Sequence, residues 1–363
     1  MTGGSTRVRG DARPRVVRLG IVGCGRATST LHLPALASVR SIEVAALCDD
    51  HGATLARATT QARAARTSRH YRALLEDASL DAIAVCVPTP YHAEIALAAI
   101  DAGKHVFVEK PLALSLSDAD RVAARAASAG VCAMVGFNTR WHAQARRARE
   151  AIRAGAIGPL DAIASRLTSF QESVPDWQRA RATGGGALLE LAIHHVDLWR
   201  YLTGAEVEEV TAYARSGERE DESAVLVAKL SGGALATAFF AERTSRSNDV
   251  EVFGRAASIS LSLYRFDGYA TADAGTLAGD GRARVRGAVG FVRALPKALR
   301  DAREGGAWLR SYADAWRHFA AAIRDDVSVS PTLEDGRSAL AVVLAAIESA
   351  SSGRSVRVAR SRA

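Results

Sequence analysis

Three segments of the sequence carry side chains whose types and spacing could do chemistry. A glycine turn at 23–28 could bind a phosphate, and Lys110 could stabilise negative charge as it forms. Glu190 and His194 share a face if their segment is helical, and they could exchange a proton with a bound hydroxyl. A phosphate site, an ammonium and an imidazole are the groups that proton handling beside a bound dinucleotide requires.

The glycine turn has the surroundings expected of a dinucleotide site. It follows an apolar run over 16–22 and opens a helix-like segment. Gly23 and Gly25 permit a tight turn and close approach of the backbone to a pyrophosphate, although Thr28 replaces the third glycine of the usual pattern. Asp49 closes the next apolar run, where a carboxylate accepts a hydrogen bond from a ribose hydroxyl and repels a 2′-phosphate. These residues predict NAD binding, with NADP disfavoured. The alternative is a turn and a surface acid without a ligand.

Lys110 follows an apolar run over 105–108, at the edge where open α/β sheets bind ligands. Lysine occurs at four positions while arginine is abundant, which favours a role that needs a compact, tunable charge. Pro111 fixes the turn and is a candidate for a cis bond. The alternative is a surface lysine beside a turn.

The third segment contains Glu190, His194 and His195. On a helix, Glu190, His194, Asp197 and Tyr201 line one side, whereas His195 falls on an apolar stripe. His194 is therefore the candidate acid/base, oriented by the Glu190 carboxylate, and His195 is a packed histidine. An ordinary helix with a solvent-facing Glu-His pair is the alternative. A metal site is not expected, because no third ligand has a telling spacing.

The elements around these residues indicate two kinds of sheet. Apolar runs at 16–22, 42–48, 82–87, 105–108 and 131–137 are separated by helical segments, which predicts a parallel sheet covered on both faces. The later strand candidates follow one another closely, which favours an open, mainly antiparallel sheet with helices on one face. They lie at 160–169, 207–214, 224–230, 234–241, 250–253 and 258–263, with helices expected at 142–154, 187–202, 312–324 and 333–351.

Composition places the chain among globular proteins of two domains. Its 363 residues are 48% hydrophobic and 24% charged. We expect a basic tail over 1–14, a dinucleotide-binding domain over 15–138 and a substrate-binding and oligomerisation α+β domain over 139–360. The net charge of +8 gathers partly in the two tails and comes without a base-reading motif, so nucleic-acid binding is not expected.

The sequence also favours a cytoplasmic protein. It has no apolar run long enough to enter and cross a bilayer, and no apolar signal core follows the first arginines. Its four cysteines lie in or beside apolar runs and lack metal-ligand spacing, which predicts buried reduced thiols.

These residues and their neighbours resemble the Gfo/Idh/MocA family, the glucose–fructose oxidoreductase and inositol dehydrogenase group. The Glu-Lys-Pro and His-His-Val-Asp segments are the more specific parts of the resemblance, which covers most of the chain. It rests on residues 23–25, 48–49, 88–92, 102–111, 184–186, 194–197 and 334–336.

The resemblance implies a Rossmann domain, a C-terminal sheet domain that forms a homodimer or homotetramer, and NAD(P) as cofactor. It implies hydride transfer between the nicotinamide and a hydroxyl or ketone of a sugar, cyclitol or nucleotide-linked sugar. The implied catalytic residues are Lys110, His194 and Glu190, which with Asn138 also bind the substrate. The implied cofactor-binding residues are Gly23, Gly25, Arg26, Ala27, Asp49, Pro88, Thr89, His92, Glu109 and Lys110.

Two departures from the family pattern stand out. The family usually carries Asp where this chain has Glu190, which shifts the carboxylate by about one methylene. The segment 291–303 places Phe291, Leu295 and Leu299 four residues apart among basic residues, as in a basic amphipathic helix that reaches an anionic substrate or a membrane surface. More often such a helix packs its apolar stripe on its own domain.

Two other functions remain open on the sequence. One is a redox-neutral lyase or glycosidase that oxidises a sugar transiently with retained NAD. The other is a non-catalytic NAD-binding regulator.

Overall fold

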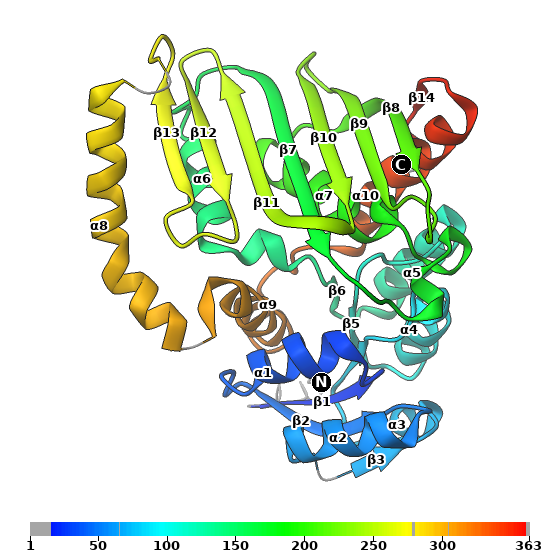
Figure 1. Cartoon of the computed structure of the whole chain (residues 1–363). Helices are drawn as coiled ribbons and strands as arrows, with labels where there is room; N and C mark the ends of the chain where they lie inside the picture. The colour runs from blue at the N-terminus through cyan, green and yellow to red at the C-terminus, as the bar shows by residue number, and fades with distance from the viewer. Residues whose placement is uncertain (1–15, 65, 278–279, 304, 361–363) are drawn as a thin grey trace, which may run out of the picture.

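The computed structural model describes residues 16–64, 66–277, 280–303 and 305–360, and it contains two sheets with helices packed between and around them (Figure 1). The basic tail predicted for 1–14 lies outside the described residues.

The first sheet has six parallel strands in the order β3-β2-β1-β4-β5-β6, and the five apolar runs that predicted a parallel sheet form all of them except β3. Its order turns back at β1, so the strands on either side of β1 lead away in opposite directions and leave a crevice at their carboxyl ends. The strands are β1 (Val17–Val22), β2 (Ile42–Cys48), β3 (Arg66–Ser68), β4 (Ala82–Val85), β5 (His105–Val108) and β6 (Ala133–Val135).

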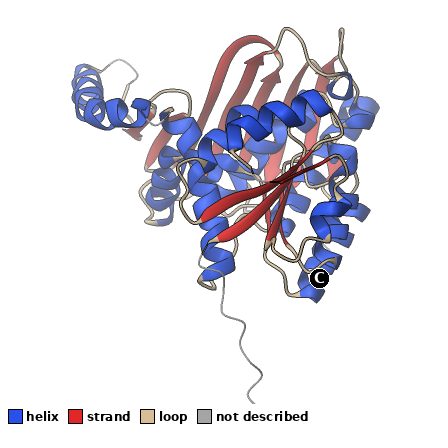
Figure 2. Ribbon diagram, turned by 90° about the horizontal axis from the view of Figure 1, so that it is seen from below, coloured by secondary structure: helices blue, strands red, loops and turns tan. Residues whose placement is uncertain are grey.

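Helices connect these strands and cover the sheet on both sides (Figure 2). The longest of them begins at Ser115, whose hydroxyl accepts a hydrogen bond from the amide of Asp118, and ends at Gly130 in the left-handed conformation. They are α1 (Leu33–Leu36), α2 (Gly52–Ala62), α3 (Arg72–Leu75), α4 (His92–Asp101) and α5 (Leu116–Ala129).

A helix from the end of the chain, α9 (Gly306–Arg324), also packs on the first sheet. The rings of Trp316 and Phe107 stack with centroids 4.2 Å apart, and Phe319 meets both edge-on. Val17, Leu19 and Ile21 of β1 belong to the same buried cluster. Cover on both faces explains why these strands are apolar throughout instead of alternating.

The second sheet has eight strands in the order β13-β12-β11-β7-β10-β9-β8-β14. Its pairs are antiparallel except β7 with β10, which confirms the mainly antiparallel prediction. The strands are β7 (Leu160–Phe170), β8 (Val207–Arg215), β9 (Ser223–Leu230), β10 (Leu235–Ala241), β11 (Arg243–Gly254), β12 (Ala257–Ser262), β13 (Tyr269–Asp273) and β14 (Val356–Arg357).

One face of the second sheet carries helices and the other is open. Burial alternates strictly along β9, where Leu226 is buried and its neighbours Val225 and Val227 are exposed. The covering helices are α6 (Ala143–Arg153), α7 (Ile193–Thr203) and α10 (Leu333–Ser352).

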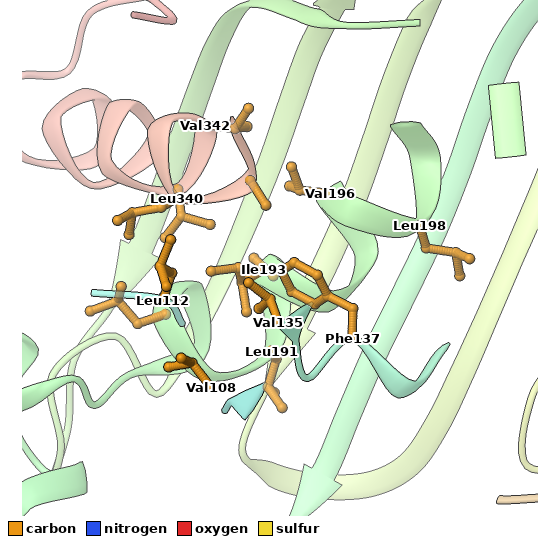
Figure 3. Packing of buried hydrophobic residues seen from close by; sticks show 14 of the residues in the cluster. Val108, Leu112, Val135, Phe137, Leu191, Ile193, Val196, Leu198, Leu340 and Val342 are labelled. Carbon is orange, nitrogen blue, oxygen red and sulfur yellow. The ribbon is translucent and has the colours of Figure 1, made fainter. Parts of the chain in front are cut away.

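The two halves share one core (Figure 3). Val108, Leu112 and Val135 of the first half pack with Ile193 of α7 and Leu340 of α10. Gly336 allows this approach, because a Cβ there would lie 2.8 Å from a methyl of Val135. The shared core fixes how the two halves sit against each other.

Some elements differ from the prediction. Strands β3, β13 and β14 were not expected, and β11 begins at residue 243 instead of 250. Each missed strand is short and lies at or next to a sheet edge, where little apolar surface is buried. All four cysteines are free, as expected, but Cys86 and Cys132 are only partly buried.

Candidate active site

The glycine turn follows β1 and has the backbone that its sequence demands. Gly23 has a φ of +94°, and a Cβ at that position would lie 2.4 Å from the carbonyl oxygen of Cys86. A Cβ at Gly25 would meet nothing within 4 Å, so its backbone faces open space. Thr28, in place of the third glycine, is buried and donates its hydroxyl hydrogen bond to the carbonyl of Gly23 at 2.6 Å. The Thr28 side chain thus stabilises the turn through a hydrogen bond that a glycine at this position could not make.

Asp49 lies beside the turn at the end of β2. Its Oδ2 accepts a hydrogen bond from the amide of Cys24 at 2.7 Å, and its Oδ1 accepts one from the amide of His51 at 2.9 Å. Arg26 reaches from the turn to the second half, where its guanidinium donates to the side-chain oxygen of Gln171 at 2.8 Å. Ala27 precedes a π-helical segment, Thr28–His32. The predicted cofactor residues of the turn therefore lie together.

The segment after β4 lies at the same edge of the first sheet as the glycine turn. Pro88 precedes a 3₁₀ turn at Thr89–Tyr91, and His92 begins α4. The buried ring of His92 contacts the carbonyl oxygen of Pro111 through Nδ1 at 2.7 Å and that of Val87 through Nε2 at 2.8 Å. His92 therefore links the ends of β4 and β5.

Glu109 and Lys110 follow β5, and the Lys110–Pro111 bond is cis, as proposed from the sequence. An oxygen of the Glu109 carboxylate lies 3.0 Å from Nε2 of the buried His32. Glu109 thus points to His32, whose ring lies against Phe107 in the core that α9 shares.

Lys110 points across the cleft to the second half. Its Nζ donates to Oε2 of Glu190 at 3.0 Å and to the backbone carbonyl of Glu190 at 3.1 Å. Both side chains are largely buried, at 12% and 14% exposure, so water screens the pair weakly. This contact joins the predicted ammonium to the predicted carboxylate.

His194 lies near Lys110 in the first turn of α7. Burial, then the charge of Lys110, then that of His195 lower the pKa of His194 well below its ordinary value. Its Nδ1 makes no hydrogen bond to any of the residues that the structure describes. The lowered pKa favours the neutral imidazole, and Nδ1 is a buried nitrogen without a hydrogen-bond partner among the described residues.

The expected orientation of His194 by Glu190 is not what the structure shows. Residues Leu188–Ala192 form a π-helix ahead of α7, and a π-helix has more residues per turn than an α-helix. Glu190 lies in this π-helical segment and His194 lies in α7, and the Glu190 carboxylate is turned to Lys110.

Two further predictions about this helix have different outcomes. His195 is buried and its Nε2 lies 3.0 Å from Oδ1 of Asn248, as expected of a packed histidine; burial lowers its pKa to about 4. Asp197 has a different partner from the one that its place beside His194 on the helix suggested. It is fully buried and forms a two-point ion pair with Arg140, at 2.6 and 2.8 Å.

Asn138 also departs from its predicted role. It is 1% exposed, and its amide nitrogen donates to the hydroxyl of Ser311 in α9 at 3.0 Å. This position supports packing between α9 and the segment after β6 more than a contact with a substrate.

The triple glycine at 184–186 brings the two halves into contact. A Cβ at Gly184 would lie 2.7 Å from the hydroxyl of Thr89, and one at Gly185 would lie 2.1 Å from the carbonyl of Gln178. A side chain at Gly184 would push the second half away from Thr89, whereas one at Gly185 would clash within the second half.

Glu242, between β10 and β11, is a residue of the site that sequence reasoning missed. It is 2% exposed, and burial followed by the charge of Glu190 raises its pKa to about 7. A guanidinium nitrogen of Arg219 lies 3.4 Å from it. The signal available in the sequence was an acid directly after the apolar Phe239-Phe240-Ala241.

Comparison with known proteins supports this description. Residues 17–137 match the family model described as "Oxidoreductase family, NAD-binding Rossmann fold", and residues 145–260 match the GFO/IDH/MocA C-terminal domain. The chain is 33% identical to a myo-inositol 2-dehydrogenase of Thermotoga maritima over 66% of this chain and 73% of that protein. It is 30% identical to an inositol 2-dehydrogenase of Rhizobium meliloti over 94% and 99% of the two chains.

The fold recurs in solved structures. The WlbA dehydrogenase from Bordetella pertussis, in complex with NADH and UDP-GlcNAcA, superposes with a TM-score of 0.81 at 22% identity, over 97% of this chain and all of that one.

Proposed function

Because the chain belongs to the Gfo/Idh/MocA family of oxidoreductases, we propose that it is a dehydrogenase for a secondary hydroxyl of a sugar or cyclitol. The observation that carries this proposal is the Lys110–Glu190 pair at the carboxyl end of β5, on the same edge of the first sheet as the glycine turn, with the charge of Lys110 lowering the pKa of His194.

The residues of the turn fit a dinucleotide. Gly23 has no room for a side chain, and the open backbone at Gly25 gives a pyrophosphate access to the amides that follow. The carboxylate of Asp49 lies at the end of β2, where it holds a ribose hydroxyl and repels the 2′-phosphate of NADP. We therefore favour NAD over NADP.

Bound NAD supplies a hydride acceptor for the carbinol carbon, and the protein handles the proton. His194, kept neutral by burial and by Lys110, accepts the hydroxyl proton. Lys110 donates a hydrogen bond to the same oxygen and stabilises its developing negative charge. Glu190 holds the ammonium in place across the cleft. In the reverse direction the same groups protonate a ketone oxygen.

The inositol dehydrogenases among the relatives favour a cyclitol or a sugar as substrate, with a nucleotide-linked sugar as the extended case. The test is formation of NADH by the purified protein with myo-inositol, scyllo-inositol, aldohexoses and UDP-sugars, each with NAD and with NADP. Tight NADH binding without turnover of any polyol would contradict the proposal.

We also propose that the open face of the second sheet joins copies of the chain. Val225, Val227, Leu235 and Phe239 are exposed on adjacent strands β9 and β10 and form an apolar surface. Light scattering of the Val227→Glu variant should report a smaller particle than the unaltered protein. An unchanged mass would contradict this interface.

Among the described residues, no helix combines the length and the apolar content needed to cross a bilayer.

A further inference from the structure

Helix α8 (Gly281–Arg303) stands at the β13 edge of the second sheet and is longer than the segment that the sequence singled out (Figure 1). Its C-terminal half packs on the body, where Leu295 and Ala298 are half-buried and Asp301 is buried. The ring of Phe291 lies against Phe266. The described side chains over 280–293 are exposed. The expectation that its apolar residues pack on its own domain therefore holds for part of the helix alone.

An apolar stripe runs along the exposed side of α8. Val285, Val289, Val292 and Leu299 follow one another by four, three and seven residues, which is the spacing of one helix face. Val285 is 65% exposed, Val292 62% and Leu299 66%. The four residues are called the α8 stripe below.

A basic row accompanies the α8 stripe. Arg293 is exposed and follows Val292 by one position, about 100° around the helix. The sequence repeats this step, with Arg286 after Val285 and Arg300 after Leu299. The acid of this helix, Asp301, is buried and lies 3.0 Å from a guanidinium nitrogen of Arg310. Arg293 therefore places positive charge beside the stripe, the sequence carries an arginine at the two equivalent positions, and no acid is exposed among the described residues of the helix.

We propose that α8 binds the surface of an anionic phospholipid membrane. A helix with an apolar stripe beside a basic row lies in the plane of the interface, with its apolar side chains among the upper acyl chains. The basic residues then meet the lipid phosphates, each contributing to the affinity. The helix lies on the surface and does not span the bilayer.

Charge favours this partner over the other occupants of an apolar stripe. A second copy docked through the same stripe brings another basic row to the contact without acids to neutralise it. A nucleic acid offers phosphates to the basic row, but its backbone leaves the exposed valines without an apolar partner. A lipid surface satisfies both features at once.

The site itself lies on other elements. The glycine turn follows β1, and Lys110 follows β5. Glu190 precedes α7 and His194 lies in it, so α8 supplies no residue of the site. Membrane attachment through α8 therefore concentrates the enzyme at a surface without altering its catalytic groups.

The test is co-sedimentation of the full chain with large vesicles of phosphatidylcholine, alone or mixed with an equal part of phosphatidylglycerol. We expect binding to the anionic vesicles at least about tenfold tighter than to the neutral ones, and weaker binding as salt is raised. Replacing the apolar side chains in Val285→Ser/Val289→Ser/Val292→Ser should weaken it by about tenfold or more. Arg286→Gln/Arg293→Gln should weaken it by about fivefold per residue.

The matched control is Val327→Ser/Arg153→Gln, which removes an exposed valine and an exposed arginine outside α8. It should bind like the unaltered protein. Circular dichroism and NADH binding show whether each variant is folded. If the valine variant does not fold, the arginine variant alone tests the proposal.

Three results would overturn the proposal. The first is no sedimentation of the unaltered chain with anionic vesicles. The second is equal loss in the control variant. The third is a smaller particle in light scattering for Val285→Ser/Val289→Ser/Val292→Ser than for the unaltered protein, which would show that the stripe joins copies of the chain. The chain could also bind duplex DNA but no vesicles. If the Val285→Ser/Val289→Ser/Val292→Ser variant then binds the DNA equally well, the basic row is a nucleic-acid site instead.

Discussion

The ammonium of Lys110 lies 3.0 Å from the carboxylate of Glu190, a residue 80 positions later in the chain. The two side chains come from the two halves of the protein and meet at the carboxyl end of β5. Both side chains are largely buried, so removing one of them leaves the charge of the other buried without a partner. The following predictions start from this arrangement.

Removing either proton-handling group should stop turnover with little effect on the cofactor. Lys110→Ala and His194→Ala are each expected to lower kcat about a hundredfold or more, because each acts on the reacting oxygen. Steady-state kinetics and NADH titration give both quantities. The control is Lys229→Ala, an exposed lysine on β9 paired with Glu209, which should change neither. Normal turnover of His194→Ala would contradict the assigned role.

The Lys110–Glu190 pair should behave as a unit. Glu190→Gln is expected to lower kcat/KM by about tenfold, because the ammonium loses the charge that holds it in place. A double-mutant cycle with Lys110→Met should be strongly non-additive, with the double variant little worse than Lys110→Met alone. Additive losses would show that Glu190 acts apart from Lys110.

Cofactor choice should depend on Asp49. Asp49→Ala is expected to weaken NAD binding by roughly tenfold to a hundredfold, the cost of a hydrogen bond to a charged group. NADP should gain relative to NAD, because the charge that repels its phosphate is gone. Isothermal titration measures both, with the exposed neighbour in Asp50→Ala as control. A preference unchanged by Asp49→Ala would refute the assignment.

The reaction should tolerate acid better than an ordinary histidine base allows. Because the pKa of His194 is held well below its usual value, the imidazole stays neutral as the pH falls through about 6.5. Oxidation should therefore keep its kcat/KM at pH values below the ordinary pKa of histidine before it declines. Lys110→Met should shift the NMR titration of His194 upward, since one cause of the lowered pKa is removed. A shift in the opposite direction would contradict this account.

Glu242 should make stability depend on pH. Its carboxyl keeps a proton to about pH 7 in the folded protein and releases it near pH 4.5 when unfolded. The free energy of unfolding therefore falls as pH rises across that window, and Glu242→Gln removes this loss. The melting temperature of Glu242→Gln relative to the unaltered protein should be higher at pH 8 than at pH 5. Exposed Glu251→Gln is the control. A difference independent of pH would refute the shift.

The sequence predicted the first sheet well because burial on both faces leaves a plain signal. Leu19, Ile83 and Val106 are fully buried in apolar runs that could hardly be anything but inner strands. Strand β3 gave no such signal, since Arg66–Ser68 is polar and lies at the edge. Register and edge pairing depend on neighbours that a local pattern does not contain.

The site was foreseen in its parts but not in all its contacts. Lys110 and His194 were singled out by their positions on a strand end and a helix. The partner of Glu190 differs from the expected one, because spacing along one helix does not include the Lys110 ammonium, which the other half of the chain brings to the carboxylate. Glu242 was missed because tertiary packing alone brings the β10–β11 connection to Glu190.

The stacking of Trp316 on Phe107 limits how this protein can be dissected. A fragment that ends near residue 138 lacks α9 and leaves the Phe107 side of its first sheet facing water. Such a piece is prone to aggregate, so the nucleotide-binding half is not a portable module. A fragment or chimera that folds has to include residues 306–324 together with the N-terminal half, with a linker in place of the chain between them.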